Sequence, residues 1–179
     1  MDIIYITEKP QNLSQQQKHY FQKLLLLQGQ IDNPSLDKIN SCPFLCLAYD
    51  KEIPIGIGAI KQVYKMPFDK AEVVEFKDIY EIELGYLYVL DKKKYRGKGI
   101  AKSICTRLLN KVKLKNVFAT TEESDENAMK WILQKFGFKK TGKTYQGGKT
   151  KKILVCICWH LHHNNNLQLT SALPQLLSF

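Results

Sequence analysis

The sequence has no long apolar run, no CxxC pair, and neither a GxGxxG nor a Walker-type phosphate loop. Its longest wholly apolar run, Ile153 to Trp159, is far shorter than the ~20 residues that span a bilayer. Its start, MDIIYITEKP, lacks the charged region and long apolar core of a secretory signal peptide. We therefore expect a cytoplasmic protein without a membrane segment.

The cysteines are odd in number, and their spacing predicts neither a zinc site nor a disulfide framework. We expect mostly buried, reduced thiols at Cys42, Cys46, Cys105, Cys156 and Cys158. His160, His162 and His163 lie close together near the C-terminus, but no spaced partner ligands accompany them. We therefore expect no metal site.

Length and composition favour one globular domain. The chain has 179 residues, of which 44% are hydrophobic and 25% charged, as in ordinary soluble proteins. We place this domain at residues 1–160. Residues 161–179 combine an asparagine run with an isolated apolar patch, and we expect a disordered or loosely docked tail.

The net charge of +10 permits nucleic acid, an anionic membrane or an anionic cofactor as a partner. Part of this charge is concentrated between Lys92 and Lys102. Because no aromatic-interleaved recognition motif is present, nucleic acid is the less favoured partner. The local cluster favours an anionic cofactor, and a solvated basic face is the alternative.

The first eighty residues contain alternating strand and helix signals. Ile3 to Thr7 reads as a strand. We expect a helix over 13–28 capped by Asn12 or Ser14, a short helix over 34–39 capped by Asn33, and a hairpin of strands 44–49 and 53–63. For 64–79 we expect a loop over the substrate side, with Phe68 and Phe76 as wall residues.

The stretch from Glu83 to Val112 predicts a strand, a basic loop and a helix. The helix begins near Ile100, where apolar residues start to recur every fourth position. The first N–H groups of a helix lack intrahelical partners, so this junction suits an anion. Gly97 and Gly99 allow close approach of a phosphate, and Arg96, Lys98 and Lys102 add positive charge. A sharp turn with solvated lysines is the alternative.

The remaining residues predict a strand over 116–121, a helix, and a hairpin of strands 138–145 and 150–160. We expect Ser124 or Asp125 to cap the helix. Its buried stripe should consist of Ala128, Trp131, Ile132 and Phe136, before Gly137 ends it.

Arg96-Gly97-Lys98-Gly99-Ile100-Ala101, with the LGYLYV strand before it and a helix after it, resembles the acyl-CoA loop of the GCN5-related N-acetyltransferases. Gly137-Phe138 also matches the end of that family's penultimate helix. The resemblance implies an α/β fold with a mixed, mostly antiparallel central sheet flanked by helices. It also implies acetyl-CoA as cosubstrate and an amine as acceptor.

Carried over by residue, the resemblance assigns the amides of 96–101 to the pyrophosphate. The backbone of Leu87, Tyr88 and Val89 is assigned to the pantetheine arm, because the preceding strand splays from its neighbour in that family. Asn127 lies close to a CoA-contacting asparagine of many members, and helix capping is its alternative role. Gly56 and Gly58 mark either close backbone approach beside the cofactor or a simple bulge.

Acetyl transfer requires a neutral amine, so a group must accept a proton from an ammonium of pKa near ~10.4. Glu83, on the central strand, matches the catalytic glutamate of some family members, with Glu81 and Glu75 as weaker candidates. The alternative is that Glu83 pairs with a lysine or binds the substrate's ammonium.

The general acid of many members is a tyrosine four residues before the closing glycine of the penultimate helix, and here that position is Leu133. Tyr145 and Tyr88 are the substitute candidates, and a thiolate of pKa about 8.5 can also leave without an acid. We expect an N-acetyltransferase acting by direct attack. The alternative is a non-catalytic acyl-CoA-binding module of the same fold.

Overall fold

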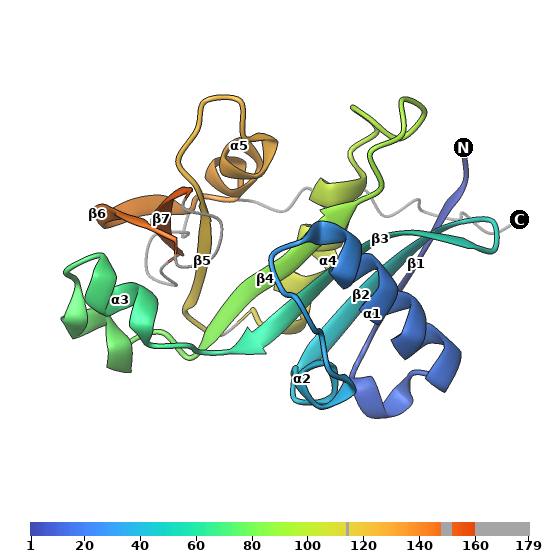
Figure 1. The fold of residues 1–179 in the computed structure, drawn as a ribbon, viewed down its shortest axis with the longest axis horizontal. Coiled ribbons are helices and arrows are strands. Elements are labelled where there is room, and N and C mark those ends of the chain that lie inside the picture. Colours follow the sequence, from blue (N-terminus) through green and yellow to red (C-terminus); the bar gives the residue numbers. More distant parts are fainter. Residues whose placement is uncertain (114, 148–151, 160–179) are drawn as a thin grey trace, which may run out of the picture.

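The sheet of this protein is mixed but mostly antiparallel. The computed structural model describes residues 1–113, 115–147 and 152–159. In this part of the chain seven strands lie in the order β1-β2-β3-β4-β5-β7-β6 (Figure 1). All described neighbours are antiparallel except β4 and β5, which run parallel. The predicted fold class is confirmed.

Helices lie between most of the strands along the chain, whereas β3 follows β2 directly and β7 follows β6 directly. The strands are β1 Ile3–Glu8, β2 Phe44–Asp50, β3 Ile53–Gln62, β4 Ile82–Val89, β5 Val117–Glu122, β6 Lys139–Gln146 and β7 Ile153–Trp159. The helices are α1 Gln15–Gln28, α2 Leu36–Asn40, α3 Met66–Lys70, α4 Ile100–Lys111 and α5 Ala128–Lys135, with 3-10 turns η1 Pro10–Asn12 and η2 Val74–Asp78.

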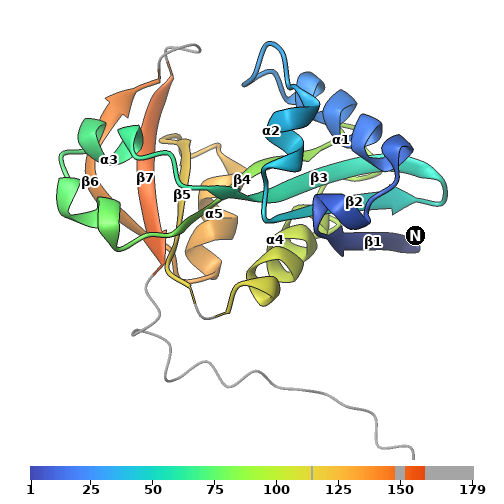
Figure 2. The same ribbon diagram turned by 90° about the horizontal axis from the view of Figure 1, so that it is seen from below.

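Helices cover both faces of the sheet. Figure 2 shows α1 and α2 on one face and α4 on the other. Strand β2 contributes to the core on both faces of the sheet. Leu45 and Leu47 pack in the cluster of α1, and Cys46 and Ala48 pack in the cluster of α4. A strand that is buried on both faces needs an almost continuous apolar sequence, which β2 has.

The first helix runs over Gln15–Gln28, within the predicted 13–28, and of the two predicted caps Ser14 is the one used. Ser14 forms a capping box, in which its hydroxyl accepts from the Gln17 amide at 3.2 Å and Gln17 accepts from the Ser14 amide at 2.8 Å. Gly29 ends the helix in the left-handed conformation, with φ of +76°. The second helix differs from the prediction, because Ser35 rather than Asn33 caps it and it starts at Leu36.

Residues 64–79 are not the open loop that we expected. They form α3 and η2, and Phe68 is fully buried, stacked on Tyr80 at 5.8 Å and tilted against Phe118 at 4.6 Å between ring centroids. Phe68 is therefore a core residue rather than a wall of the substrate side. Turns this short cannot show helical periodicity, although Pro67 in the first turn of α3 is a typical start signal.

The predicted buried stripe of α5 is partly wrong. Trp131 is 52% exposed, its indole N–H donating to the carbonyl of Asp125 at 2.9 Å, while Leu133 is buried. The helix starts at Ala128, and Asn127 caps it instead of Ser124 or Asp125.

All five cysteines are buried and free, as expected. No described residues form a group of three potential metal ligands, and within the same residues no helix is long and apolar enough to cross a bilayer. The histidines at 160, 162 and 163, the tail from 161 and the first residues of the last predicted strand lie outside the described residues.

Candidate active site

The site is built where the two parallel strands separate. β4 and β5 pair only through Ile82 with Val117 and Glu83 with Phe118. Beyond this point the strands open into a V (Figure 1). Backbone groups of β4 past Glu83 therefore face the gap without a strand partner on that side. The splaying that the family resemblance implies is present.

A bulge lies in the same part of β4. Ile57 is opposite Tyr88 and Ala59 is opposite Gly85, so Tyr86 and Leu87 together oppose Gly58. Tyr86 has a φ of +55°, in the left-handed region. A Cβ on Gly58 would lie 2.6 Å from a methyl group of Ile104 in α4. A bulge and a close approach thus both occur at Gly58, but the approaching element is a helix of the protein itself.

The predicted phosphate loop lines a cavity of about 600 Å³. Gly97 and Gly99 have φ of +68° and +72°, and a Cβ on either would meet nothing within 4 Å. No side chain caps the N-terminus of α4, whose first N–H groups lack intrahelical partners, and the residues from Gly99 to Lys102 line this cavity. The described lining residues are Val89, Leu90, Asp91, Tyr95, Arg96, Gly97, Gly99, Ile100, Ala101, Lys102, Ala128, Ile132 and Lys135.

Asp50, the last residue of β2, anchors this loop. Its carboxylate accepts from the buried Tyr95 hydroxyl at 3.0 Å and from the Lys94 ammonium at 2.7 Å. The hydrogen bond from Lys94, followed by that from Tyr95, lowers the pKa of Asp50 below its ordinary value. Arg96, which is 71% exposed, makes a bidentate pair with Asp91. This exposed ion pair therefore links the loop to the residue that follows Leu90 at the end of the strand region.

A second cavity, of about 800 Å³, lies deeper in the V. The linings of the two cavities come close to each other on β4, where Leu87 lines the deeper cavity and Val89 the outer one. They also come close on α5, where Met129 lines the deeper cavity and Ile132 the outer one. Its other described lining residues are Gln28, Gln30, Ile31, Lys38, Ser41, Cys42, Lys61, Gln62, Tyr64, Pro67, Glu83, Leu84, Gly85, Tyr86, Ala119, Thr120, Thr121, Glu122, Asn127 and Leu133.

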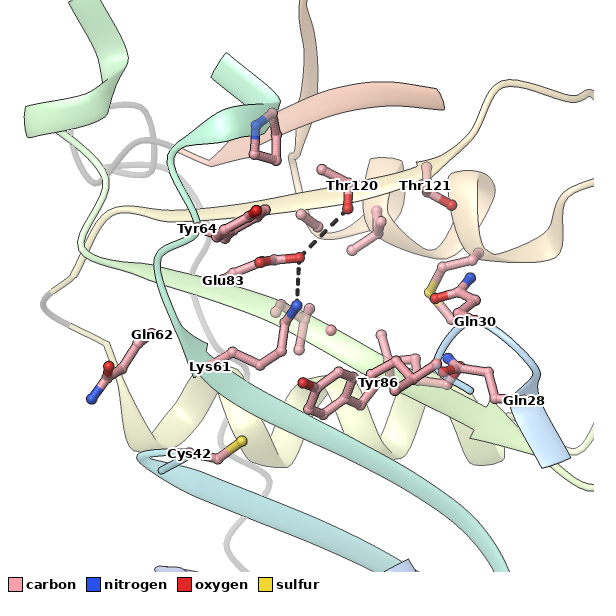
Figure 3. A pocket seen from close by; sticks show the side chains of 18 of the residues that line it. Gln28, Gln30, Cys42, Lys61, Gln62, Tyr64, Glu83, Tyr86, Thr120 and Thr121 are labelled. Carbon is pink, nitrogen blue, oxygen red and sulfur yellow. Dashed lines mark hydrogen bonds and ion pairs between the residues drawn. The ribbon is translucent and has the colours of Figure 1, made fainter. Parts of the chain in front are cut away.

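Glu83 lies at the apex of the V and is only 5% exposed. Its Oε1 is 2.9 Å from the Nζ of Lys61, and the Thr120 hydroxyl donates to the same oxygen at 3.5 Å (Figure 3). Lys61 faces Glu83 across the β3–β4 ladder. The sequence left open that Glu83 pairs with a lysine, and in this structure it does.

Gly85 and Tyr86 hold the Lys61 side chain in this position. A Cβ on Gly85 would lie 2.6 Å from Cε of Lys61, so any other residue there would displace the lysine. The Lys61 ammonium also lies 4.7 Å from the centre of the Tyr86 ring, as a cation–π contact. Burial, followed by the nearby Cys42 thiol and Glu83, raises the pKa of Tyr86 to about 12.

Gln28, at the end of α1, reaches the bulge from the other side of the cavity. Its Nε2 donates to the carbonyl of Leu87 at 2.8 Å, and its Oε1 is buried with no partner among the described residues. This carbonyl belongs to the backbone stretch that the family resemblance assigns to the pantetheine arm.

Asn127 caps α5 and also lines the deeper cavity. Its Oδ1 accepts from the Met129 amide at 3.0 Å, and its Nδ2 donates to the Thr121 hydroxyl and the Glu122 carbonyl. The capping role proposed from the sequence is therefore filled. Its side-chain groups are engaged within the protein.

Of the two tyrosines considered as acids, neither is among the described residues that line these two cavities. Tyr145 packs against the cluster of Phe68 and Phe118, and Tyr88 packs on the α1 side of the sheet. Burial, followed by Cys156 and then Glu83, raises the pKa of Tyr145 above its ordinary value. Tyr145 thus keeps its proton near neutral pH.

Sequence reasoning did not single out Lys61, Gln28 or Tyr86. The register of the antiparallel β3–β4 pair brings Lys61 opposite Glu83, and this register shifts at the bulge. Gln28 reaches Leu87 only through the packing of α1 on the sheet. Such long-range pairs leave no periodic signal in one sequence.

The model of the acetyltransferase (GNAT) family matches residues 5–138. No curated protein matches the sequence. Among solved structures, Escherichia coli ElaA is similar with a TM-score of 0.64 and 14% identity, over 89% of this chain and all of ElaA. Arabidopsis thaliana Naa50, in complex with a bisubstrate analogue, has a TM-score of 0.62 and 16% identity, over 87% of this chain and 98% of its own. The putative acetyltransferase yncA of Salmonella typhimurium, with acetyl-CoA, has a TM-score of 0.59 and 13% identity, over 91% and 96%.

Proposed function

The chain belongs to the acetyltransferase (GNAT) family, and from that premise we propose that it transfers an acetyl group from acetyl-CoA to a primary amine, with Glu83 as general base. One observation carries the proposal. A buried carboxylate lines a cavity that adjoins the phosphate-loop cavity along β4 and α5. An acyl donor anchored in the outer cavity would present its thioester toward this carboxylate.

Acetyl-CoA would be held by the loop and by the open edge of β4. The amides of 96–101 suit its pyrophosphate, and Lys102 adds charge beside them. The backbone of Leu87 to Val89 would bond the pantetheine arm, and Asn127 would contact the cofactor where it passes α5. The structure of yncA with acetyl-CoA and that of Naa50 with a CoA-containing analogue support this assignment by analogy of fold.

The reaction needs no covalent enzyme intermediate. Glu83 would take a proton from the acceptor ammonium, and the neutral amine would attack the thioester carbonyl. Departure of the free thiolate, whose ordinary pKa is about 8.5, is the favoured route, because Tyr145, our candidate to protonate it, lines neither cavity.

A second candidate function is a non-catalytic acyl-CoA-binding module. The ion pair of Lys61 with Glu83 favours it, because a lysine of the protein occupies the carboxylate that the acceptor would need. The presence of Leu133 where many family members have a tyrosine also favours the binding module.

Release of CoA thiol from acetyl-CoA with a panel of primary amines tests the proposed function. We expect Glu83→Gln to lower the rate by about 10²–10⁴-fold, because a general base contributes about that much. The matched control is Glu81→Gln, since Glu81 lies just before β4 but is exposed and pairs with Lys115. Acetyl-CoA binding measured by calorimetry without any turnover would instead support the binding module.

A further inference from the structure

The buried ion pair in the deeper cavity joins two groups that acetyl transfer requires, an amine and a base. Nζ of Lys61 is 2.9 Å from the carboxylate of Glu83, and both side chains line this cavity. In Figure 3 the lysine reaches across from β3 and points at the carboxylate. An acceptor ammonium bound for catalysis would need the same place.

We propose that Lys61 is itself an acceptor and becomes Nε-acetylated by the protein's own reaction. The inference rests on the proposed function, since it uses the same base and the same acyl donor. It adds a covalent modification site within the cavity.

The position of the lysine is fixed by its surroundings. Because Gly85 has no side chain, there is room beside it for Cε of Lys61. The Lys61 ammonium lies 4.7 Å from the centre of the Tyr86 ring and is paired with the carboxylate of Glu83. The side chain is 21% exposed, so it is open to the cavity although it is held. A nucleophile held beside its base gains the large effective concentration of an intramolecular reaction.

The step balances with groups that are already named. The carboxylate of Glu83 takes a proton from the Lys61 ammonium, and the neutral amine adds to the thioester carbonyl of acetyl-CoA. The carbon–sulfur bond then breaks as the amide bond forms, and the departing sulfur takes up a proton. The products are Nε-acetyl-Lys61 and CoA thiol, and no redox partner is needed.

Lys38 provides an internal comparison. It lines the same cavity, but among the described residues no carboxylate pairs with its ammonium, and it is exposed. Proximity to the donor alone would label both lysines. Assistance by Glu83 would label Lys61 in preference.

The test incubates the purified full chain with isotope-labelled acetyl-CoA and maps the label by peptide mass spectrometry over time. We expect one acetyl group per chain at Lys61, with a rate constant that does not depend on protein concentration. Excess desulfo-CoA should block labelling at Lys61. In Glu83→Gln the rate at Lys61 should fall by about 10²–10⁴-fold. Thermal unfolding with and without CoA checks that this variant is folded and binds, and Glu83→Asp provides a second, milder variant.

Three outcomes would overturn the inference. If Lys61 stays unlabelled while the same sample acetylates an added amine, the proposed function stands and the inference fails. If neither Lys61 nor any amine is acetylated although CoA binds, both fail. Equal rates at Lys61 in the wild type and in Glu83→Gln, or equal labelling of Lys38, would show chemical acetylation without the base.

Discussion

At the scale of single residues, the pair of Glu83 and Lys61 bears on the stability of the protein as well as on the proposed chemistry. A buried charge is costly unless it is paired, and removing one partner leaves the other uncompensated. Here the side chain of Glu83 is 6% exposed and that of Lys61 is 21% exposed, so the pair is neither fully buried nor a surface contact. The choice of an ionic pair at this position is explained by function better than by stability.

Lys61→Met should therefore destabilise the protein by roughly 1–3 kcal/mol, less than the ~3–5 kcal/mol of a fully buried pair because water reaches the lysine. Combining it with Glu83→Leu should recover much of this loss, since no unpaired charge remains. Urea unfolding measures both. The matched control is Lys65→Met, which breaks an exposed pair with Asp78 and should cost less than about 1 kcal/mol. If the double variant lost as much stability as the two single variants together, this explanation would be wrong.

Three buried thiols make the free energy of unfolding depend on pH in a definite direction. Burial is the largest cause that raises the pKa of Cys42 to about 12, of Cys46 to about 11 and of Cys105 to about 12, from 9.0. The folded state holds these protons more tightly than the unfolded state. Their contribution to the free energy of unfolding is thus fully present below pH 9 and is lost as pH rises toward 11–12.

Urea unfolding between pH 7 and pH 11 should accordingly show falling stability above about pH 9. A variant with alanine at these three positions should show a smaller fall, although its absolute stability is lower. Native protein at neutral pH should react slowly with thiol reagents, whereas unfolded protein should react at all five cysteines. If stability fell equally in the wild type and in the alanine variant, other groups such as Tyr86 would be the cause.

At the scale of elements, the junction between β4 and α4 contains two left-handed glycines, Gly97 and Gly99, and Gly29 offers a matched site outside it. Gly99 has φ of +72° at the N-terminus of α4, and Gly29 has φ of +76° at the end of α1. A Cβ would meet nothing within 4 Å at either position. The two sites are therefore matched in backbone strain, and of the two only Gly99 lines the outer cavity.

Gly99→Ala and Gly29→Ala should each cost roughly 1–2 kcal/mol of stability, since a left-handed conformation is unfavourable with a Cβ. Only Gly99→Ala should also weaken CoA binding, by about tenfold or more, because the new methyl group and any shift in φ disturb the amides that face the phosphates. Calorimetry with CoA measures this difference. Equal affinities in the two variants would mean that the loop does not bind the pyrophosphate.

The local elements were predictable from sequence because their signals are local. The capping box at Ser14, the stripe from Ile100 and the hairpin after Phe44 each lie within one short stretch. The glycine loop was predictable for the same reason. Errors arose where tertiary packing decides the outcome: Phe68 is drawn into an aromatic cluster, and the late start of α5 leaves Trp131 outside. The Lys61–Glu83 pair lies beside a bulge that cannot be predicted from the spacing of residues in the sequence.

At the scale of the whole molecule, the sheet consists of two parts joined at one narrow point. β1 to β4 form one part and β5 to β7 the other, with two residue pairs between them. The cavities lie along this division, and residues of both parts line them. A ligand that fills them would therefore connect the two parts.

Acetyl-CoA should thus raise the unfolding temperature, by the equivalent of about 2.7 kcal/mol at one hundred times its dissociation constant. The effect should diminish at high salt, because the phosphates meet the lysines near Lys102 at an exposed site. S-acetylpantetheine, which lacks these phosphates, serves as the control in differential scanning calorimetry. Equal stabilisation by both compounds would place the binding energy in the arm rather than in the loop.

The strand order also bears on how the chain reaches its native state during synthesis. β7 is the last described strand in the sequence, yet it lies between β5 and β6. Domains acquire structure as the chain leaves the ribosome, N-terminal parts first. The part formed by β1 to β4 can assemble early, whereas β5 and β6 must wait for residues up to Trp159 to emerge before their shared neighbour exists. Until then Glu83 can have its lysine, but β5, whose Thr120 hydroxyl donates to Glu83, still lacks its neighbour β7.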